Sequence, residues 1–95
     1  VGQQMMMVSG FTDDMPVRGS HSKFSDNWEL SAQRALTVTR TLIEEGVPAD
    51  AIFAAAFGSQ QPVAPNNDAE GRARNRRVEM APVPKSSQPA KESNG

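Results

Sequence analysis

Residues 26–36 read Asp26-Asn27-Trp28-Glu29-Leu30-Ser31-Ala32-Gln33-Arg34-Ala35-Leu36 and predict the start of the only long helix in the chain. The side chain of Ser25, Asp26 or Asn27 can cap the first free N–H groups of this helix. Glu29 falls in the first turn, where the helix dipole favours an acid. The pattern continues to Glu45, with one stripe that we expect to be largely buried: Trp28, Ala32, Ala35, Leu36, Val38, Thr39, Leu42 and Ile43.

Two residues of this helix depart from a simple amphipathic pattern. Leu30 is apolar but points away from the stripe, and Arg34 lies at the edge of the stripe on the same side as Leu30. An arginine in such a position most often rests its stem on the core and keeps its charge in water. It can also be held to receive a carboxylate through two parallel hydrogen bonds. Gly46 and Pro48 then end the helix.

The length and composition of the chain exclude several classes of protein. Its 95 residues predict one small domain. The absence of cysteine excludes disulfides and thiolate metal sites. A formal charge of −1 gives no overall attraction to nucleic acid or to an acidic membrane. The sequence has no apolar run long enough to cross a bilayer, no signal-peptide pattern and no initiator methionine, and we expect it to be part of a longer protein.

The other segments predict an α+β domain. Met5–Phe11, Ile52–Phe57 and Arg77–Met80 are typical of strands, and residues 69–74 of a short helix. We interpret the three consecutive methionines, residues 5–7, as packing residues rather than copper ligands. The order of elements predicts a mixed sheet with helices on one face. We expect residues 1–81 to form the domain and residues 82–95 to be a disordered tail, because the tail is too polar to bury a core.

Three groups of residues offer chemistry. The turn Thr12-Asp13-Asp14 is either solvated or presents a carboxylate to a ligand. A hydrolase triad using His21 and its serine neighbours is disfavoured, because no nucleophile motif accompanies them. Four arginines within residues 72–77 suggest an anion site. No aromatic residue interleaves with these arginines and the chain is net acidic, which argues against nucleic acid as the partner.

Five short motifs occur in order along the chain. They are Gly10-Phe11-Thr12-Asp13, Asn27 with Leu30-Ser31-x-x-Arg34-Ala35-x-x-Val38, Gly46-Val47-Pro48, Phe57-Gly58 with Gln61-Pro62-Val63-Ala64-x-Asn66, and Gly71-Arg72-Ala73-x-Asn75-Arg76-Arg77-Val78-Glu79. Together they resemble the OmpA-like peptidoglycan-binding domain over residues 5–80. The acidic turn, the long loop after it and Asn27-Trp28-Glu29-Leu30-Ser31 are similar to the flagellar stator branch of that family, MotB/PomB/MotD.

The resemblance implies non-covalent binding of peptidoglycan, with no catalysis, no cofactor and no metal. The residue at the position of Asp13 takes the ammonium of diaminopimelate in this family, and the residue at the position of Arg34 takes its carboxylate. Asn75 and Arg76 are equally well explained by a structural role. The site that the resemblance implies comprises Thr12, Asp13, Asn27, Leu30, Arg34 and Arg77.

The resemblance also implies partners and a location. These are a homodimer, and a MotA-like stator partner reached through a membrane segment that has no counterpart in this sequence. The domain is then the periplasmic part of an inner-membrane-anchored protein. The first strand and first helix of the family also have no counterpart here, and the usual histidine is Phe11.

Four alternatives remain open from the sequence. The first is a wall anchor belonging to another envelope protein. The second is a nucleic-acid-binding module that uses the arginines. The third is a wall hydrolase using Asp13, Asp14 and His21. The fourth is a fragment that no longer folds alone and that could dimerise through an exposed sheet edge, by edge pairing or strand exchange.

Overall fold

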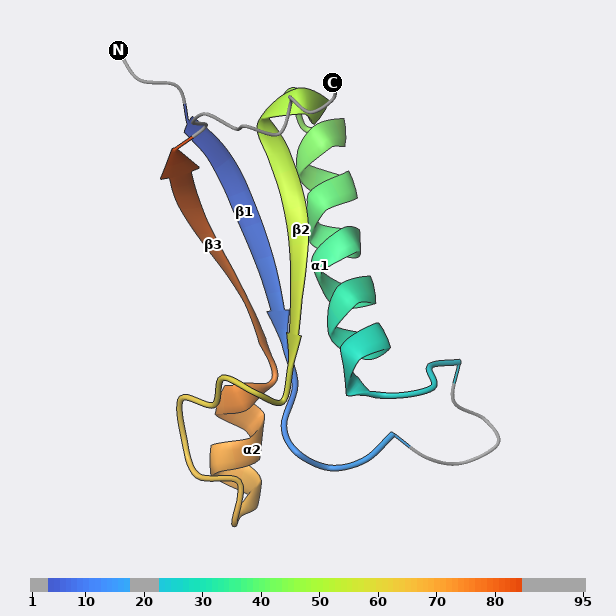
Figure 1. Ribbon diagram of the computed structural model, residues 1–95, viewed down its shortest axis with the longest axis vertical. Coiled ribbons are helices and arrows are strands. Elements are labelled where there is room, and N and C mark those ends of the chain that lie inside the picture. The colour runs from blue at the N-terminus through green and yellow to red at the C-terminus, as the bar shows by residue number, and fades with distance from the viewer. Residues whose placement is uncertain (1–3, 18–22, 85–95) are drawn as a thin grey trace, which may run out of the picture.

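The computed structural model describes residues 4–17 and 23–84 (Figure 1). The sheet has the strand order β2-β1-β3, with β1 parallel to β2 and antiparallel to β3. The predicted α+β fold with a mixed sheet is confirmed. In chain order the elements are β1 (Gln4–Phe11), α1 (Asn27–Glu44), the 3-10 turn η1 (Ala49–Ala51), β2 (Ile52–Gly58), α2 (Ala69–Asn75) and β3 (Arg77–Pro84).

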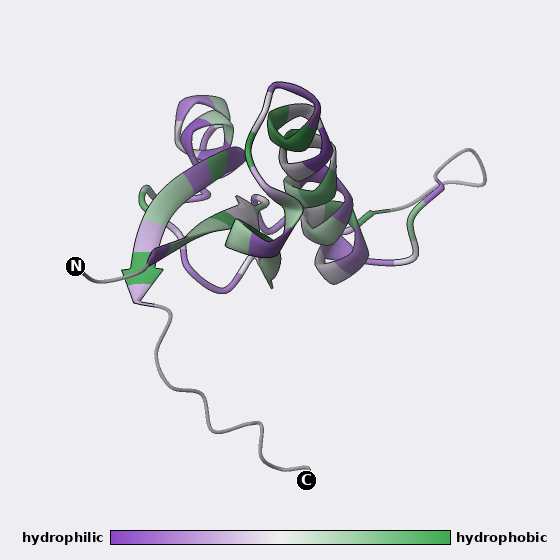
Figure 2. Cartoon of the chain, turned by 90° about the horizontal axis from the view of Figure 1, so that it is seen from above, coloured by the Kyte–Doolittle hydropathy of each residue, from purple (hydrophilic) through white to green (hydrophobic). Residues whose placement is uncertain are grey.

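Helix α1 packs along the sheet, mainly against β2 and β1 (Figure 1). Because β1 and β2 are parallel, α1 is the crossover that joins them. Seen from above, α1 mixes apolar and polar segments, as expected of an amphipathic helix (Figure 2). The short helix α2 lies beyond the end of the sheet at which β1 and β2 finish (Figure 1). That end of the molecule therefore gathers the start of α1, the ends of both parallel strands and α2.

Both ends of α1 follow from its flanking residues. Asp26 is the N-cap, and its Oδ1 accepts from the N–H of Glu29 at 2.9 Å. The Glu29 carboxylate accepts in return from the N–H and the hydroxyl of Ser25, at 2.7 and 2.9 Å. Of the three predicted caps, the structure therefore uses Asp26, with Ser25 bonded to the first turn. At the other end Gly46, which was predicted to end the helix, has a positive φ of 118°.

The start of α1 lies unusually close to the sheet. A Cβ on Gly10 would lie 2.0 Å from the carbonyl oxygen of Ser31, so only glycine permits this approach. The Ser31 hydroxyl accepts from the N–H of Gly58 at 3.0 Å and donates to the carbonyl of Trp28 at 3.0 Å. The Thr12 N–H donates to the carbonyl of Gly58 at 2.8 Å. These bonds fix the start of α1 against the ends of β1 and β2.

The core between α1 and the sheet is small. Ala35 and Thr39 are buried as the helical stripe predicted, but the prediction is wrong for Trp28, whose exposed fraction is 51%. Ser31 faces the sheet instead, because a bulky side chain does not fit where the helix main chain meets Gly10. The core consists of Val8, Ala35 and Ile52, surrounded by the partly buried Met6, Val38, Leu42, Ile43, Val47, Ala54 and Val78.

Strand β3 is longer than the sequence predicted. Residues 82–84, which we assigned to the tail, belong to this strand. Proline is tolerated there because β3 is an edge strand, so a missing N–H can face away from β1. Pro82 and Pro84 are two residues apart, so the backbone positions at which their N–H groups are missing point to the same side of β3. Two hydrogen-bond donors are thereby absent from the outer edge of this strand. Edge pairing through β3 is thereby disfavoured at its Pro82–Pro84 end, whereas β2 forms the other edge of the sheet. Residues 85–95 lie outside the described part of the chain.

Replacing Gly10 with alanine tests the close approach of α1. We expect Gly10→Ala to lower the free energy of unfolding by about 2–3 kcal/mol, because the new methyl group meets main chain that cannot rotate away. Urea denaturation followed by circular dichroism measures this loss. An unchanged unfolding midpoint would contradict the packing described here.

The N-terminal turn of α1 predicts a pH effect. Hydrogen bonds from the backbone and then the hydroxyl of Ser25 lower the pKa of Glu29. A lowered pKa in the folded state means that Glu29 stabilises the fold above its ordinary pKa, and that this contribution is lost as the pH falls through the lowered value. The stability difference between wild type and Glu29→Gln should therefore shrink on acidification. Urea titrations of both proteins between neutral pH and pH about 3 measure it, and a pH-independent difference would contradict the assignment.

Candidate functional site

Thr12 and Asp13 follow directly after β1, at the end of the sheet where β2 also finishes. Open α/β sheets bind ligands outside the carboxyl ends of their parallel strands, so this is the expected place for a site. Thr12 is buried, and its hydroxyl donates to the carbonyl of Asp13 at 2.8 Å. Thr12 thus holds the main chain that carries the Asp13 carboxylate.

The Asp13 carboxylate is paired within the chain. Its Oδ2 accepts from Nη1 of Arg76 at 2.7 Å, and its Oδ1 accepts from the N–H of Met15 at 3.1 Å. The Asp13 side chain is only 11% exposed, whereas that of Arg76 is 44% exposed. A carboxylate has about four acceptor positions, so Asp13 retains capacity for a further donor.

Asn27, the first residue of α1, joins that helix to the acidic turn. Its Nδ2 donates to the carbonyl of Met15 at 3.1 Å and to that of Asp13 at 3.4 Å. The sequence suggested Asn27 as a wall of the ligand pocket. In the structure the side-chain amide of Asn27 holds the main chain of Asp13 and Met15 in place.

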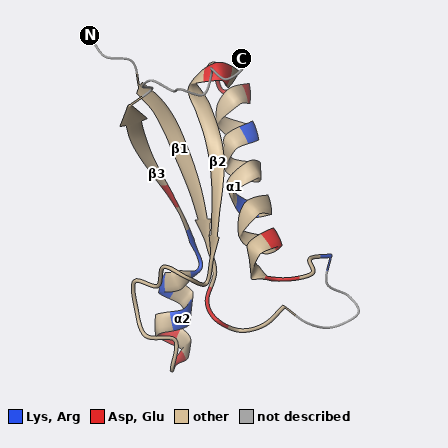
Figure 3. Cartoon of the chain, viewed as in Figure 1, with Lys and Arg blue, Asp and Glu red and all other residues tan. Residues whose placement is uncertain are grey.

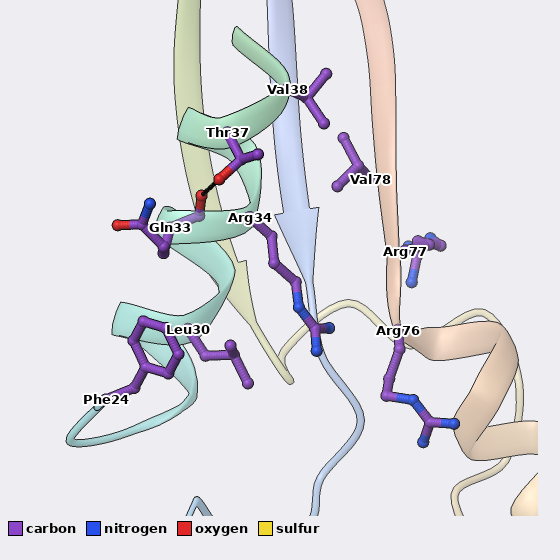
Figure 4. A pocket seen from close by; sticks show the side chains of 9 residues that line it. All are labelled: Phe24, Leu30, Gln33, Arg34, Thr37, Val38, Arg76, Arg77 and Val78. Atoms are coloured by element: carbon purple, nitrogen blue, oxygen red, sulfur yellow. Dashed lines mark hydrogen bonds between the residues drawn. The ribbon is translucent and has the colours of Figure 1, made fainter. Parts of the chain in front are cut away.

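A pocket of about 600 Å³ opens between α1 and β3 (Figure 4). This volume lies within the range of about 300–1,000 Å³ that is usual for small-ligand sites. The predicted site residues Leu30, Arg34 and Arg77 lie together in it, and Asp13 is joined to it through Arg76. The residues that line the pocket are Phe24, Leu30, Gln33, Arg34, Thr37, Val38, Arg76, Arg77 and Val78.

Arg34 carries the free charge of this pocket. Its side chain extends from α1 toward the side on which Arg76 lies (Figure 4). Arg76 is paired with Asp13, and Arg77 is paired with Glu79. Arg34 takes part in no hydrogen bond or ion pair with another described residue. The pocket therefore holds one guanidinium without a partner from the described part of the chain.

Arg77 is held more firmly than Arg34. Besides its ion pair with Glu79, it donates from Nη2 to the carbonyl of Gln61 at 3.0 Å. Its guanidinium carbon lies 3.8 Å from the ring centroid of Phe11, a cation–π contact. Phe11 in turn stacks on Phe57, with ring centroids 5.0 Å apart. These contacts leave Arg77 less able than Arg34 to take a ligand.

The arginine cluster of residues 72–77 is mostly bonded within the molecule. Arg72 donates to the carbonyl of Asn66 at 3.2 Å, and the partners of Arg76 and Arg77 are the acids given above. Figure 3 shows these basic residues around α2 and the start of β3, close to the acidic loop after β1. Guanidinium groups occupied in this way favour a structural role over a phosphate-binding surface.

Asn75 is the polar residue that closes the corner between α2 and the loop before it. It is fully buried, and its Oδ1 accepts from the N–H groups of Val63 and Ala64 at 2.8 and 3.0 Å. Its Nδ2 donates to the carbonyl of Ala64 at 2.9 Å and to Oδ1 of Asn66 at 2.8 Å. The role of Asn75 is thus structural, whereas its neighbour Arg76 lines the pocket.

Removing this amide should be costly. We expect Asn75→Ala to lower the free energy of unfolding by about 3 kcal/mol, because buried N–H and carbonyl groups lose their partners. The exposed Asn67, in the loop before α2, is the matched control, and Asn67→Ala should change stability by less than about 0.5 kcal/mol. Equal effects of the two substitutions in urea denaturation would contradict the structural role of Asn75.

Sequence reasoning missed part of the pocket. Thr37 and Val38 follow Leu30 at i+7 and i+8, on the flank of α1 where the sequence already placed Arg34, so they could have been found from spacing alone. Arg76 gives no such signal, because its partner Asp13 is 63 positions away in the sequence.

Three further features concern metal ligands, membrane-spanning helices and His21. Within residues 4–17 and 23–84, no three or more His, Asp or Glu side chains gather in a way that could hold a metal ion. In the same ranges, no helix is both long and apolar enough to cross a membrane. His21 lies outside these ranges.

Comparison with known proteins agrees with this fold. The sequence pattern of the OmpA family matches residues 2–76. Motility protein B of Bacillus subtilis is 42% identical over 81 residues, which cover 84% of this chain and 30% of that protein. Peptidoglycan-binding protein ArfA of Mycobacterium tuberculosis is 42% identical over 73 residues, 77% of this chain and 21% of that protein. The crystal structure of the periplasmic domain of Helicobacter pylori MotB superposes with a TM-score of 0.79 at 35% identity, covering 94% of this chain and 54% of that one.

The chain therefore belongs to the OmpA family, with motility protein B among its relatives at about 40% identity. It spans less than a third of the length of the two curated relatives named above.

Proposed function

We propose that this chain binds peptidoglycan non-covalently, by holding the diaminopimelate of the stem peptide in the pocket between α1 and β3. The observation that carries the proposal is the guanidinium of Arg34, which lies in that pocket without a partner among the described residues. A free guanidinium in a partly apolar pocket favours a planar anion such as a carboxylate. The mycobacterial relative named as a peptidoglycan-binding protein supports the same class of ligand.

The pocket suits both the charged and the apolar parts of diaminopimelate. Arg34 would take the carboxylate of the free zwitterionic end through two parallel hydrogen bonds. Asp13 would take the ammonium with the acceptor positions that Arg76 and Met15 leave open. The aliphatic side chains of Leu30, Val38 and Val78 would cover the methylene chain between the two ends. No bond is made or broken in this mode of binding, so the proposed role is not catalytic.

The relatives named motility protein B support a more specific role in a flagellar motor. In that role this periplasmic domain would attach a membrane-anchored stator subunit to the wall, as a homodimer and with a MotA-like partner. A wall anchor of another envelope protein is the second candidate. The observation that favours it is ArfA, because its identity to this chain equals that of the Bacillus subtilis motility protein.

Substituting Arg34 tests the pocket. We expect Arg34→Ala to weaken co-sedimentation with diaminopimelate-type sacculi by about tenfold or more, because a charge-assisted hydrogen bond contributes about 1.5–3 kcal/mol. Arg40 is the matched control, since it lies exposed on the same helix and does not line the pocket. Arg40→Ala should bind like wild type. Circular dichroism confirms that each variant is folded, and undiminished binding by folded Arg34→Ala would contradict the proposal.

Comparing two types of cell wall, with diaminopimelate or with lysine in the stem peptide, tests the same pocket independently. Lysine-type sacculi lack the side-chain carboxylate that Arg34 would bind, so wild type should bind them more weakly and Arg34→Ala should lose nothing further. Asp13→Asn removes the charge for the ammonium but keeps an acceptor for Met15, and it should weaken binding to both types of wall. Wild-type binding by Asp13→Asn would show that Asp13 serves only to hold Arg76.

A further inference from the structure

Trp28 is the most conspicuous side chain that the proposed pocket does not use. It does not line the pocket between α1 and β3, and 51% of it is exposed although its position belongs to the predicted buried stripe. A large aromatic side chain left half in water at the end of a helix loses the stabilisation that burial would give. The exposed part of the indole is therefore available to contact a ligand.

The indole ring is held flat against the main chain. A Cβ on Gly58 would have three indole ring atoms as its nearest neighbours, at 3.2, 3.2 and 3.6 Å. Three ring atoms at nearly equal distances indicate that Gly58 meets the face of the ring rather than its edge. Gly58 itself has a φ of 59°, which favours glycine independently of this contact. One face of Trp28 is thus supported by Gly58, and much of the rest of the ring is open to solvent.

Two polar residues follow Gly58 in the chain. Ser59 and Gln60 directly follow Gly58, and Nε2 of Gln60 donates to the hydroxyl of Ser59 at 3.2 Å on the surface. The N–H of Gln60 donates to the carbonyl of Phe57 at 3.1 Å, which holds the turn. An exposed aromatic face matches the face of a pyranose ring. Such a ring presents C–H groups on its face and hydroxyl or acetamido groups at its rim.

The position of Trp28 relative to the pocket also fits a sugar. Trp28 and Leu30 are two residues apart, so they point to opposite flanks of α1, which is about 10 Å across. In peptidoglycan, two amino acids and a lactyl group separate the muramic acid ring from the diamino acid. At about 3.4 Å per unit, this segment spans roughly 10 Å. One helix end can therefore contact the sugar on one flank and the diamino acid on the other.

We propose that the exposed face of Trp28 is a saccharide subsite, on which a pyranose ring of the glycan strand stacks while the stem peptide occupies the pocket at Arg34. The subsite extends the proposed function, and it rests on that function for the identity of the sugar. Binding then depends on the glycan as well as on the peptide.

Trp28 is the only tryptophan of the chain, so intrinsic fluorescence reports on it directly. We expect the peptide-free disaccharide of N-acetylglucosamine and N-acetylmuramic acid to shift the emission to shorter wavelength, saturably, because the sugar displaces water from the indole. Arg34→Ala should respond in the same way. The free stem tripeptide should give a smaller shift in wild type. No saturable change with up to about 10 mM disaccharide, the range of weak single-ring contacts, would overturn the subsite.

Binding to intact wall gives the second measurement. Trp28→Ala should reduce co-sedimentation with sacculi about two- to tenfold, the effect of losing one aromatic stacking contact, and Trp28→Phe should retain most of the binding. The matched control is Phe53, which is also exposed but lies in β2 away from this end of α1. Phe53→Ala should bind like wild type. Wild-type binding by folded Trp28→Ala would overturn the subsite.

The two proposals fail separately. A fluorescence shift with the disaccharide combined with undiminished sacculus binding by Arg34→Ala would reject the peptide pocket and support the saccharide subsite. Loss of sacculus binding by Arg34→Ala, without any effect of the disaccharide or of Trp28→Ala, would support the peptide pocket and reject the saccharide subsite.

Discussion

The close approach of α1 to β1, at Gly10 and Ser31, is the constraint on which the rest of this structure depends. It brings helix main chain within reach of the strand, and the Ser31 hydroxyl then bonds the end of β2 at Gly58. With the helix fixed there, its two flanks are aimed in set directions. One flank carries Leu30 and Arg34 into the pocket, and the other lays Trp28 on Gly58. A single packing contact thus orients both of the sites proposed here.

The electrostatics of the site follow from which charges find partners inside the chain. Asp13 and Arg76 neutralise each other and join the turn after β1 to the corner after α2. Arg77 is occupied by Glu79 and by the ring of Phe11. Of the three arginines that line the pocket, this leaves Arg34 as the one without a partner in the described part of the chain. A pocket with one uncompensated cation beside a mostly paired carboxylate suits a zwitterion better than a simple anion.

Much of the fold was predictable because its signals are local. A cap among residues 25–27, the stop at Gly46 and the unusual placement of Leu30 all follow from short stretches of sequence. The order of the elements predicted the mixed sheet. The exposure of Trp28 was not predictable, because helical spacing does not show which side chain has room above Gly58. The pairing of Asp13 with Arg76 was equally hidden, since only the folded chain brings them together. The extension of β3 through Pro82 required knowing that β3 is an edge strand.

The most direct measurement follows the arginine side chains themselves while a ligand is added. Titrating meso-diaminopimelic acid into the protein labelled with ¹⁵N-arginine resolves the Nε–H signal of each arginine, and the spectrum of Arg34→Lys assigns Arg34. We expect the Arg34 signal to shift and saturate, with a smaller change at Arg76 and none at Arg40. An unchanged Arg34 signal in the folded protein would contradict the central claim that this guanidinium receives the carboxylate of the wall peptide.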